Sequence, residues 1–239
     1  MKRSNRKYST TAISPFLAMT LLLLVPGRCA RLHAESSPAP PLKVAFVISN
    51  NANVIDMTGP WEVFQDAAAG DQSGFELFTV SESADAITMT GGLRVVPNYT
   101  FENAPHPDVV VIGAQEGTPH LSDWLRARAT DSRVVMSVCT GAFKLANAGL
   151  LDGKKATTHH EFWEPFAQKF PKVDLQRGNR FVQSSDVIYT AGGLTSGIDL
   201  ALHIVEKFYG RVAADRTAAY MEHQRSSTKK DVKGETEGD

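Results

Sequence analysis

The sequence predicts an α/β fold, a three-layer sandwich in which a mainly parallel sheet is covered by helices on both faces. Short apolar runs rich in β-branched residues alternate with longer segments of helical character, which is typical of parallel sheets. Several of these runs stop abruptly at glycine or polar residues, as strands do where a loop begins. The 239 residues, 42% of them hydrophobic and 21% charged, are enough for one sizeable domain.

The predicted strands are apolar runs bounded by glycine, proline or polar residues. In chain order they cover residues 42–48, 75–80, 108–112, 133–138 and 187–191. Two further runs, over residues 86–89 and 93–96, flank Gly91 and Gly92 and indicate a hairpin. Short extended pieces are predicted over residues 173–175 and 180–182.

The first predicted helix follows a polar loop over residues 50–58 that carries Asp56. Because proline is well tolerated in the first turn of a helix, Pro60 favours a helix start there and a helix over residues 61–69. The other helices are predicted from their apolar spacing over residues 121–129, 143–148, 161–169, 195–208 and 212–223.

The first 34 residues are typical of a secretory signal peptide. Lys2, Arg3 and further basic residues precede a short apolar segment, a Pro-Gly break and a small residue for cleavage, Ala34. The apolar segment is short of the roughly 20 residues that span a bilayer, so an uncleaved anchor is the lesser alternative. Cys29 lacks a good lipidation context. We therefore predict an exported protein, periplasmic or secreted, with no stable membrane association after the signal peptide is removed.

The remaining chain divides into a linker over residues 35–41, a domain over residues 42–223 and a polar, disordered tail over residues 224–239. The formal net charge of −1 gives no overall field that would attract nucleic acid. After cleavage at Ala34, Cys139 is the single cysteine left, so no disulfide can form within the mature chain.

Cys139 lies where an apolar run stops and small residues lead into a helical segment. This pattern predicts a strand–turn–helix junction with a thiol at its tip. The N-terminus of the following helix favours the thiolate, which is the nucleophilic form. The alternative is a small buried hydrophobic residue, the commonest role of a free cysteine.

Four unusual loops are predicted to converge at one edge of the sheet. Asp56, Gly113-Ala114, Cys139-Thr140 and Gly192-Gly193 all come just after predicted strands. Ligand sites of parallel sheets lie beyond the carboxyl ends of the strands. The sequence has no Rossmann or P-loop glycine pattern and no metal-spaced Cys/His cluster, so we predict neither a cofactor nor a metal.

Five segments in the same order resemble the ThiJ/PfpI superfamily. They read VIDMTGPWEVF at 54–64, DVVVIGA at 108–114, SVCTGA at 137–142, ATTH at 156–159 and TAGGLTSGIDLAL at 190–202. The resemblance covers residues 42–223 and implies a flavodoxin-like fold of the class I glutamine amidotransferase type, usually a homodimer. Thr140 after the cysteine and an aspartate at position 56 are most similar to the isonitrile hydratases and to the ligand domains of AraC-type regulators.

The resemblance to isonitrile hydratases implies that Cys139, Asp56 and Thr140 are catalytic. Cys139 would add to the isonitrile carbon, Asp56 would supply a proton, and water would release a formamide. The backbone at Gly113 and Ala114, with the N–H of Thr140, would stabilise developing charge. His159 is a possible auxiliary residue, as in branches with a Cys–His pair. Alternatively, Asp56 and Thr140 only cap helices and His159 is structural.

Two other functions stay open at this point. The chain could be a non-catalytic binding or sensor module in which Cys139 reacts with oxidants or electrophiles. It could also have a glyoxalase-, deglycase- or protease-like activity. The predicted partner is a small-molecule substrate.

Overall fold

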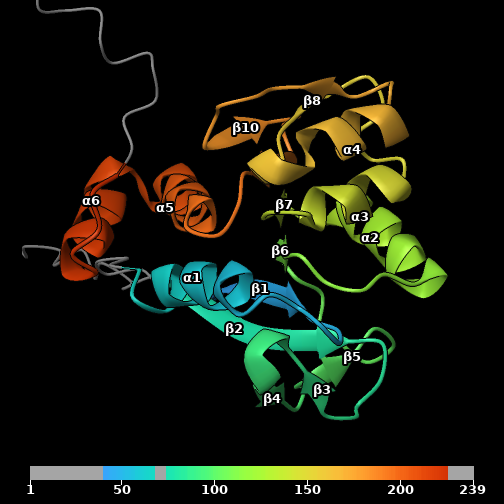
Figure 1. Ribbon diagram of the computed structural model, residues 1–239. Coiled ribbons are helices and arrows are strands. Elements are labelled where there is room, and N and C mark those ends of the chain that lie inside the picture. Colours follow the sequence, from blue (N-terminus) through green and yellow to red (C-terminus); the bar gives the residue numbers. More distant parts are fainter. Residues whose placement is uncertain (1–39, 68–73, 226–239) are drawn as a thin grey trace, which may run out of the picture. The chain divides into compact units, whose positions relative to one another are not determined.

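The computed structural model describes residues 40–67 and 74–225 of the chain (Figure 1). The predicted signal peptide, residues 35–39 of the predicted linker and residues 226–239 of the predicted tail lie outside the described residues. Among the residues that are described, no helix has both the length and the apolar character needed to cross a membrane.

The central sheet has seven strands in the order β10-β11-β7-β6-β1-β2-β5, and only β10 pairs antiparallel to its neighbour. Their bounds are Leu42–Val47 for β1, Phe75–Ser81 for β2, Tyr99–Thr100 for β5, Val109–Ile112 for β6, Val134–Ser137 for β7, Phe181–Gln183 for β10 and Ile188–Ala191 for β11. The predicted mainly parallel sheet is confirmed, and the carboxyl ends of β1, β6, β7 and β11 share one edge.

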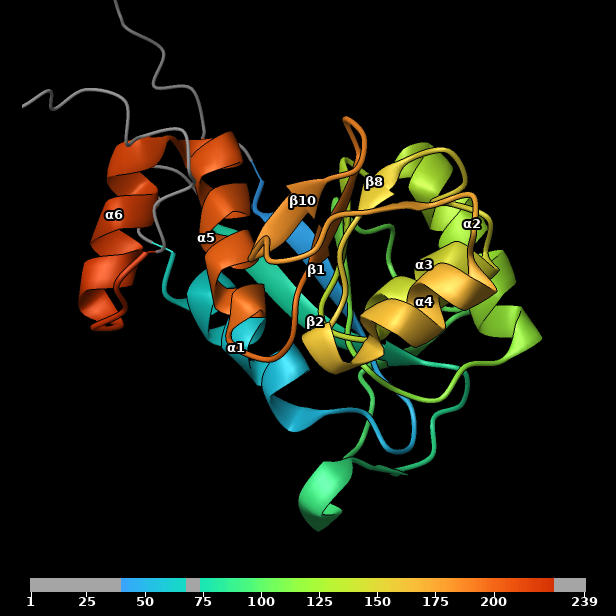
Figure 2. The same ribbon diagram turned by 45° about the horizontal axis from the view of Figure 1, so that its top comes forward.

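Helices cover both faces of this sheet (Figure 2). One face packs against α1 (Val54–Gln65), α5 (Ser196–Tyr209) and α6 (Arg211–Tyr220); the other packs against α2 (Pro119–Asp131), α3 (Gly141–Asn147) and α4 (Trp163–Lys169). Because side chains alternate along a strand, Val109 and Val111 of β6 join the first core while Val110 and Ile112 join the second. This continuous burial explains why the strands are apolar throughout.

Helix α1 begins at Val54, earlier than predicted, and ends at Gln65. The prediction of a loop over residues 50–58 was wrong in its second half, since Asp56 lies in the first helical turn and Pro60 lies inside the helix. Proline in a helix interior lacks the N–H that would bond four residues back. The helix nevertheless packs closely here, because a Cβ on Gly59 would come within 3.0 Å of Ile198 in α5.

A small hairpin flanks the start of α1. Strands β3 (Ile87–Thr88) and β4 (Arg94–Val95) pair antiparallel around the 3-10 helix η1 (Thr90–Gly92), so the predicted hairpin is confirmed. The Asn51 N–H donates to the Thr88 carbonyl at 2.9 Å, and the Thr90 N–H donates to the Ala52 carbonyl at 3.0 Å. These bonds fix the segment that leads into α1, and thereby the position of Asp56.

The remaining short elements are β8 (Lys155–Ala156), η2 (His160–Phe162) and β9 (Asp174–Leu175). The two-residue strand β5 was not predicted, because it is too short to show periodicity.

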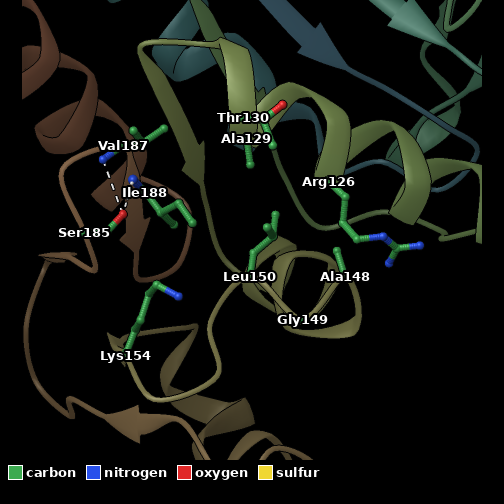
Figure 3. A pocket seen from close by; sticks show the side chains of 10 residues that line it. All are labelled: Arg126, Ala129, Thr130, Ala148, Gly149, Leu150, Lys154, Ser185, Val187 and Ile188. Atoms are coloured by element: carbon green, nitrogen blue, oxygen red, sulfur yellow. Dashed lines mark hydrogen bonds between the residues drawn. The ribbon is translucent and has the colours of Figure 1, made fainter.

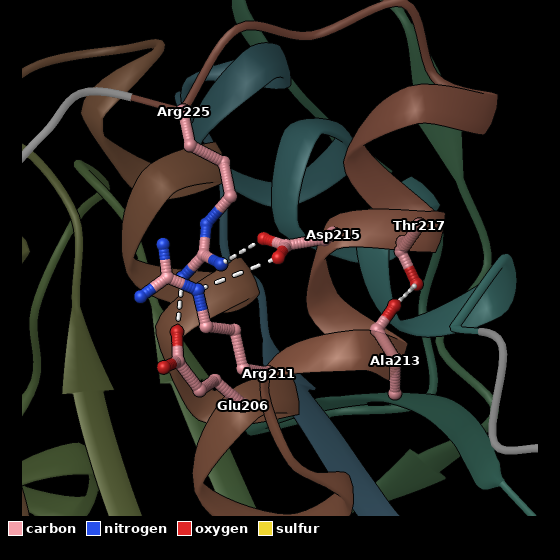
Figure 4. A network of polar contacts seen from close by, with 6 residues as sticks. All are labelled: Glu206, Arg211, Ala213, Asp215, Thr217 and Arg225. Carbon is pink, nitrogen blue, oxygen red and sulfur yellow. Dashed lines mark hydrogen bonds and ion pairs between the residues drawn. The ribbon is translucent and has the colours of Figure 1, made fainter.

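An ion-pair network links Arg225, which follows α6, to both α5 and α6 (Figure 4). Arg225 binds Asp215 of α6, with 2.6 Å between Nη1 and Oδ1, and also binds Glu206 of α5. Arg211 approaches the same Asp215 at 3.5 Å. The network holds α6 against α5, whose first turn borders the site described next.

Candidate active site

Asp56, Ala114 and Cys139 meet at the carboxyl edge of the sheet, as predicted. The Ala114 N–H, just after β6, donates to Asp56 Oδ2 at 2.9 Å. The Cys139 N–H, just after β7, donates to the carbonyl of Gly192 at 2.7 Å, which brings in the loop after β11. Loops that are far apart in the sequence therefore build one site, because parallel strands deliver their carboxyl ends to a common edge.

Cys139 sits on a sharp turn between β7 and α3. Its φ of 59° is in the left-handed region that a non-glycine residue rarely adopts, and such strain is concentrated at functional sites. The Thr158 hydroxyl donates to the Cys139 carbonyl at 2.9 Å and helps to hold this conformation. The predicted strand–turn–helix junction is confirmed.

Gly141 allows the turn to press against β6. A Cβ at this position would be forced into the carbonyl oxygen of Ile112 and would lie 3.0 Å from that of Gly113. These are backbone atoms of the last residue of β6, a central strand, and of the residue that follows it, so they cannot move aside easily.

We expect Gly141→Ala to destabilise the fold by about 2–4 kcal/mol, the range for overpacking and strain at a fixed backbone. Urea denaturation followed by circular dichroism measures this change. Gly149→Ala is the control, because no atom lies within 4 Å of its Cβ position and its cost should come only from its φ of 75°. Equal stability of Gly141→Ala and the native chain would contradict the close packing of Gly141 against the backbone of Ile112 and Gly113.

Asp56 is fully buried. Burial raises the pKa of its carboxyl from the ordinary 3.8 to about 6; the Ala114 N–H, the Cys139 thiol and the Leu194 N–H lower it by less. The second carboxyl oxygen, Oδ1, has no hydrogen-bond partner of ordinary geometry among the described residues. A Cβ on Gly113 would lie 2.6 Å from the Asp56 Cβ, so glycine is needed for the acid to sit this close to β6.

Cys139 is only 6% exposed, and its sulfur faces the Asp56 carboxyl. Burial first, and the Asp56 charge second, raise the pKa of the thiol to about 12 against smaller opposing contributions from the Thr140 and Leu194 N–H groups. The expected thiolate was therefore wrong for the resting site. The short helix α3 cannot outweigh the loss of hydration and a neighbouring carboxylate.

The two groups share one exchangeable proton near neutral pH. With a pKa of about 6 for Asp56 and about 12 for Cys139, the resting pair is a carboxylate next to a neutral thiol. Asp56 can accept the thiol proton when the sulfur attacks and can then deliver it to the substrate. The arrangement is thus a nucleophile with its own general base and acid.

The other predicted site residues lie around this pair. The Thr140 backbone N–H is directed at the sulfur, and the Thr140 side chain makes no capping hydrogen bond to α3. The Ala114 N–H holds Asp56. His159 accepts a hydrogen bond from the Glu161 N–H through Nδ1 at 3.3 Å, and its ring lies against Gly193. No contact between His159 and Cys139 occurs among the described interactions.

Leu194 was missed by the sequence prediction. Its N–H lowers the pKa of both Asp56 and Cys139, so it faces both groups, and its φ is 53°. The Gly192-Gly193 pair predicted a site loop here. Leucine, however, rarely adopts a left-handed backbone, so nothing in the sequence indicated that Leu194 does.

A cavity of about 470 Å³ lies elsewhere (Figure 3). Its lining residues come from the C-terminal ends of α2 and α3 and from the start of β11, away from the carboxyl edge of the sheet. None of them is a predicted site residue. The described residues also hold no group of three His, Cys, Asp or Glu side chains arranged for a metal ion.

Comparison with known proteins gives a consistent picture. The model of the DJ-1/PfpI family matches residues 42–207. An isonitrile hydratase of Pseudomonas putida is 32% identical over 190 residues, which cover 76% of this chain and 78% of that enzyme.

A second relative is the HTH-type transcriptional regulator GbdR of Pseudomonas aeruginosa, 30% identical over 179 residues. The match covers 72% of this chain and 48% of the regulator, so the chain spans about half of that protein's length. Among solved structures, a ThiJ/PfpI family protein from Pseudomonas syringae superimposes with a TM-score of 0.66 at 24% identity, covering 82% of this chain and 85% of that one. This last likeness supports the fold.

Proposed function

Because this chain belongs to the DJ-1/PfpI family, we propose that it is a cysteine-dependent hydratase that converts isonitriles into N-substituted formamides. The observation that carries the proposal is the buried Asp56 carboxyl facing the Cys139 thiol on a strained turn. The 32% identical isonitrile hydratase supports the substrate class. Export of the chain and its assembly as a homodimer stay predictions from the sequence.

The first step joins the sulfur to the isonitrile carbon. Asp56 takes the proton of the Cys139 thiol and passes it to the lone pair of that carbon. The sulfur then forms a bond to the carbon while one pair of C–N bonding electrons moves to nitrogen. The product is a thioimidate, R–N=CH–S–Cys139. The proton has moved from sulfur to carbon, so the Asp56 carboxylate is regenerated.

The second step consumes one water molecule. Water adds its oxygen to the thioimidate carbon and a proton to the nitrogen, and the N–H groups of Thr140 and Leu194 face the charge on the departing sulfur. The C–S bond then breaks, and the hydroxyl proton returns to sulfur through Asp56. The formamide R–NH–CHO leaves and the thiol is restored. The Thr140 hydroxyl is suited to orient the water, since it does not cap α3.

Narrow access to the sulfur supports this substrate class. At 6% exposure, Cys139 presents little surface to solvent. The N≡C group is linear and one atom wide at its reactive end, so its terminal carbon reaches a recessed sulfur while the rest of the molecule stays outside. A peptide bond or a hydrated aldehyde is wider, which disfavours protease- and glyoxalase-like activities.

Incubation of the full chain with cyclohexyl isocyanide tests the proposal. We expect N-cyclohexylformamide to accumulate at neutral pH, followed by gas chromatography or ¹H NMR of the formyl proton. Methylglyoxal serves as the control substrate, and lactate should not form from it. Formation of lactate without any formamide would refute the hydratase activity and favour a glyoxalase-like activity.

A binding function without turnover is the second candidate, because relatives such as GbdR are transcriptional regulators that share this domain. Saturable binding of cyclohexyl isocyanide without formamide would favour it. A redox-sensing role is less well supported, since a thiol pKa near 12 leaves little thiolate to react with peroxide.

A further inference from the structure

Two large apolar side chains are exposed beside the site. Leu194 is 40% exposed and Phe162 is 41% exposed, although most large apolar side chains of the described residues are buried. Single exposed apolar residues are common and need no explanation. These two are different because Leu194 adjoins the reactive pair, and Phe162 contacts the His159 ring, which also lies against Gly193, the residue before Leu194. We call Leu194 and Phe162 the apolar rim.

Leu194 connects this rim to the reactive pair. Its backbone N–H faces both Asp56 and Cys139, while its side chain is partly exposed to solvent. The backbone has a φ of 53°, a conformation that glycine or asparagine adopts with less strain than leucine. Leucine therefore costs stability here and exposes apolar surface, and a functional contact of the side chain accounts for both.

Phe162 is held in place by aromatic contacts. Its ring packs edge-on against Phe143 of α3 at 6.3 Å between centroids, and against His159 at 5.9 Å. The His159 ring in turn lies so close to Gly193 that a Cβ there would clash with it. His159 thus contacts both Phe162 and Gly193, the residue before Leu194, and links the two members of the rim.

We propose that Leu194 and Phe162 bind the N-substituent of the substrate and select apolar, cycloalkyl or aryl, groups. The inference rests on the proposed function and specifies its substrates. As the isonitrile carbon approaches the recessed Cys139 sulfur, the linear N≡C unit directs the substituent outward, past the N–H of Leu194. An apolar substituent covers the exposed side chains of the rim and removes them from water. A charged substituent would be dehydrated against them without a partner.

Truncation of the rim should change substrate preference. For Leu194→Ala and Phe162→Ala, we expect the ratio of kcat/KM for cyclohexyl isocyanide to that for methyl isocyanide to fall about tenfold, the size of effect of a lost apolar contact. Val212→Ala on α6 is the matched control, since Val212 is 64% exposed and α6 contributes no residue to the site. It should leave the ratio unchanged.

A second measurement is independent of turnover. Cyclohexyl and methyl isothiocyanate carry the same linear N=C=S group, whose carbon bonds to the Cys139 sulfur while the thiol proton moves to nitrogen, giving a dithiocarbamate. The ratio of the two modification rates, measured by mass spectrometry and normalised to free cysteine, should fall about tenfold in Leu194→Ala. Leu194→Asn should show the same fall without loss of stability, because asparagine tolerates the left-handed backbone.

The outcomes separate the two proposals. If the native chain forms no formamide but the isothiocyanate ratio falls in both Leu194 variants, the hydratase is refuted and the rim stands as a selective surface. If formamide forms but both ratios stay within twofold of the native values in Leu194→Ala, Leu194→Asn and Phe162→Ala, the rim is refuted.

Discussion

Cys139→Ala is expected to abolish formamide production, with a fall in kcat of at least about 10³-fold, because no other side chain at the site can form the covalent intermediate. The fold should persist. The lost contacts are those of one small buried side chain, which corresponds to a change of about 1 kcal/mol. Formamide release and urea denaturation measure the two effects separately.

The Cys139→Ala variant should also alter its neighbour. The thiol lowers the pKa of Asp56, and burial, which raises it, does not change. The pKa of Asp56 should therefore rise above its native value of about 6, which a carboxyl-selective infrared or NMR titration can follow. Cys139→Ser is the matched control, because it keeps a hydrogen-bond donor of similar size but a much weaker nucleophile. Full activity of either variant would remove Cys139 from the mechanism.

The convergence of the site could be predicted from the sequence because it depends on topology. Apolar runs followed by unusual residues at Asp56, Gly113 and Cys139 imply parallel strands that end at a common edge. The start of α1 could not be placed. Pro60 is a good first-turn residue, whereas the helix start at Val54 is fixed by hydrogen bonds from residues 51–54 to the β3–β4 hairpin and to the Ala114 carbonyl.

The protonation states of the site could not be predicted either. A helix N-terminus after Cys139 favours a thiolate when considered alone. The pKa of a buried group instead reflects the sum of hydration loss, neighbouring charge and hydrogen bonds. For Cys139 the first two dominate, and neither burial nor the distance to Asp56 can be seen in the sequence. The left-handed backbone of Leu194 escaped prediction for a similar reason, since leucine is not a residue that signals it.

Asp56→Asn is expected to lower activity by about 10²–10⁴-fold while raising stability. The amide retains an oxygen that can accept from the Ala114 N–H but cannot move the thiol proton. The pKa of Asp56 is raised from 3.8 to about 6 in the folded chain, so the folded state favours the protonated acid. The native chain then loses stability as the pH rises from about 4 through 6. The loss reaches about 3 kcal/mol, equivalent to about two pKa units.

The asparagine variant has no such titration, so its advantage over the native chain should appear across that same pH interval. At pH 4 the two proteins should differ little, whereas at pH 7.5 the variant should be more stable by about 1–3 kcal/mol, less any cost of an unpaired amide N–H₂. Urea denaturation at both pH values, below the range in which Cys139 titrates, measures the difference. Glu62→Gln is the control, an exposed carboxyl on the same helix whose loss should change stability by less than about 0.5 kcal/mol and leave turnover intact. A variant that is less stable than the native chain at pH 7.5 would mean that the surroundings stabilise the Asp56 carboxylate. Burial would then not raise the pKa of Asp56, and the proposed role of Asp56 in proton transfer would lose its basis.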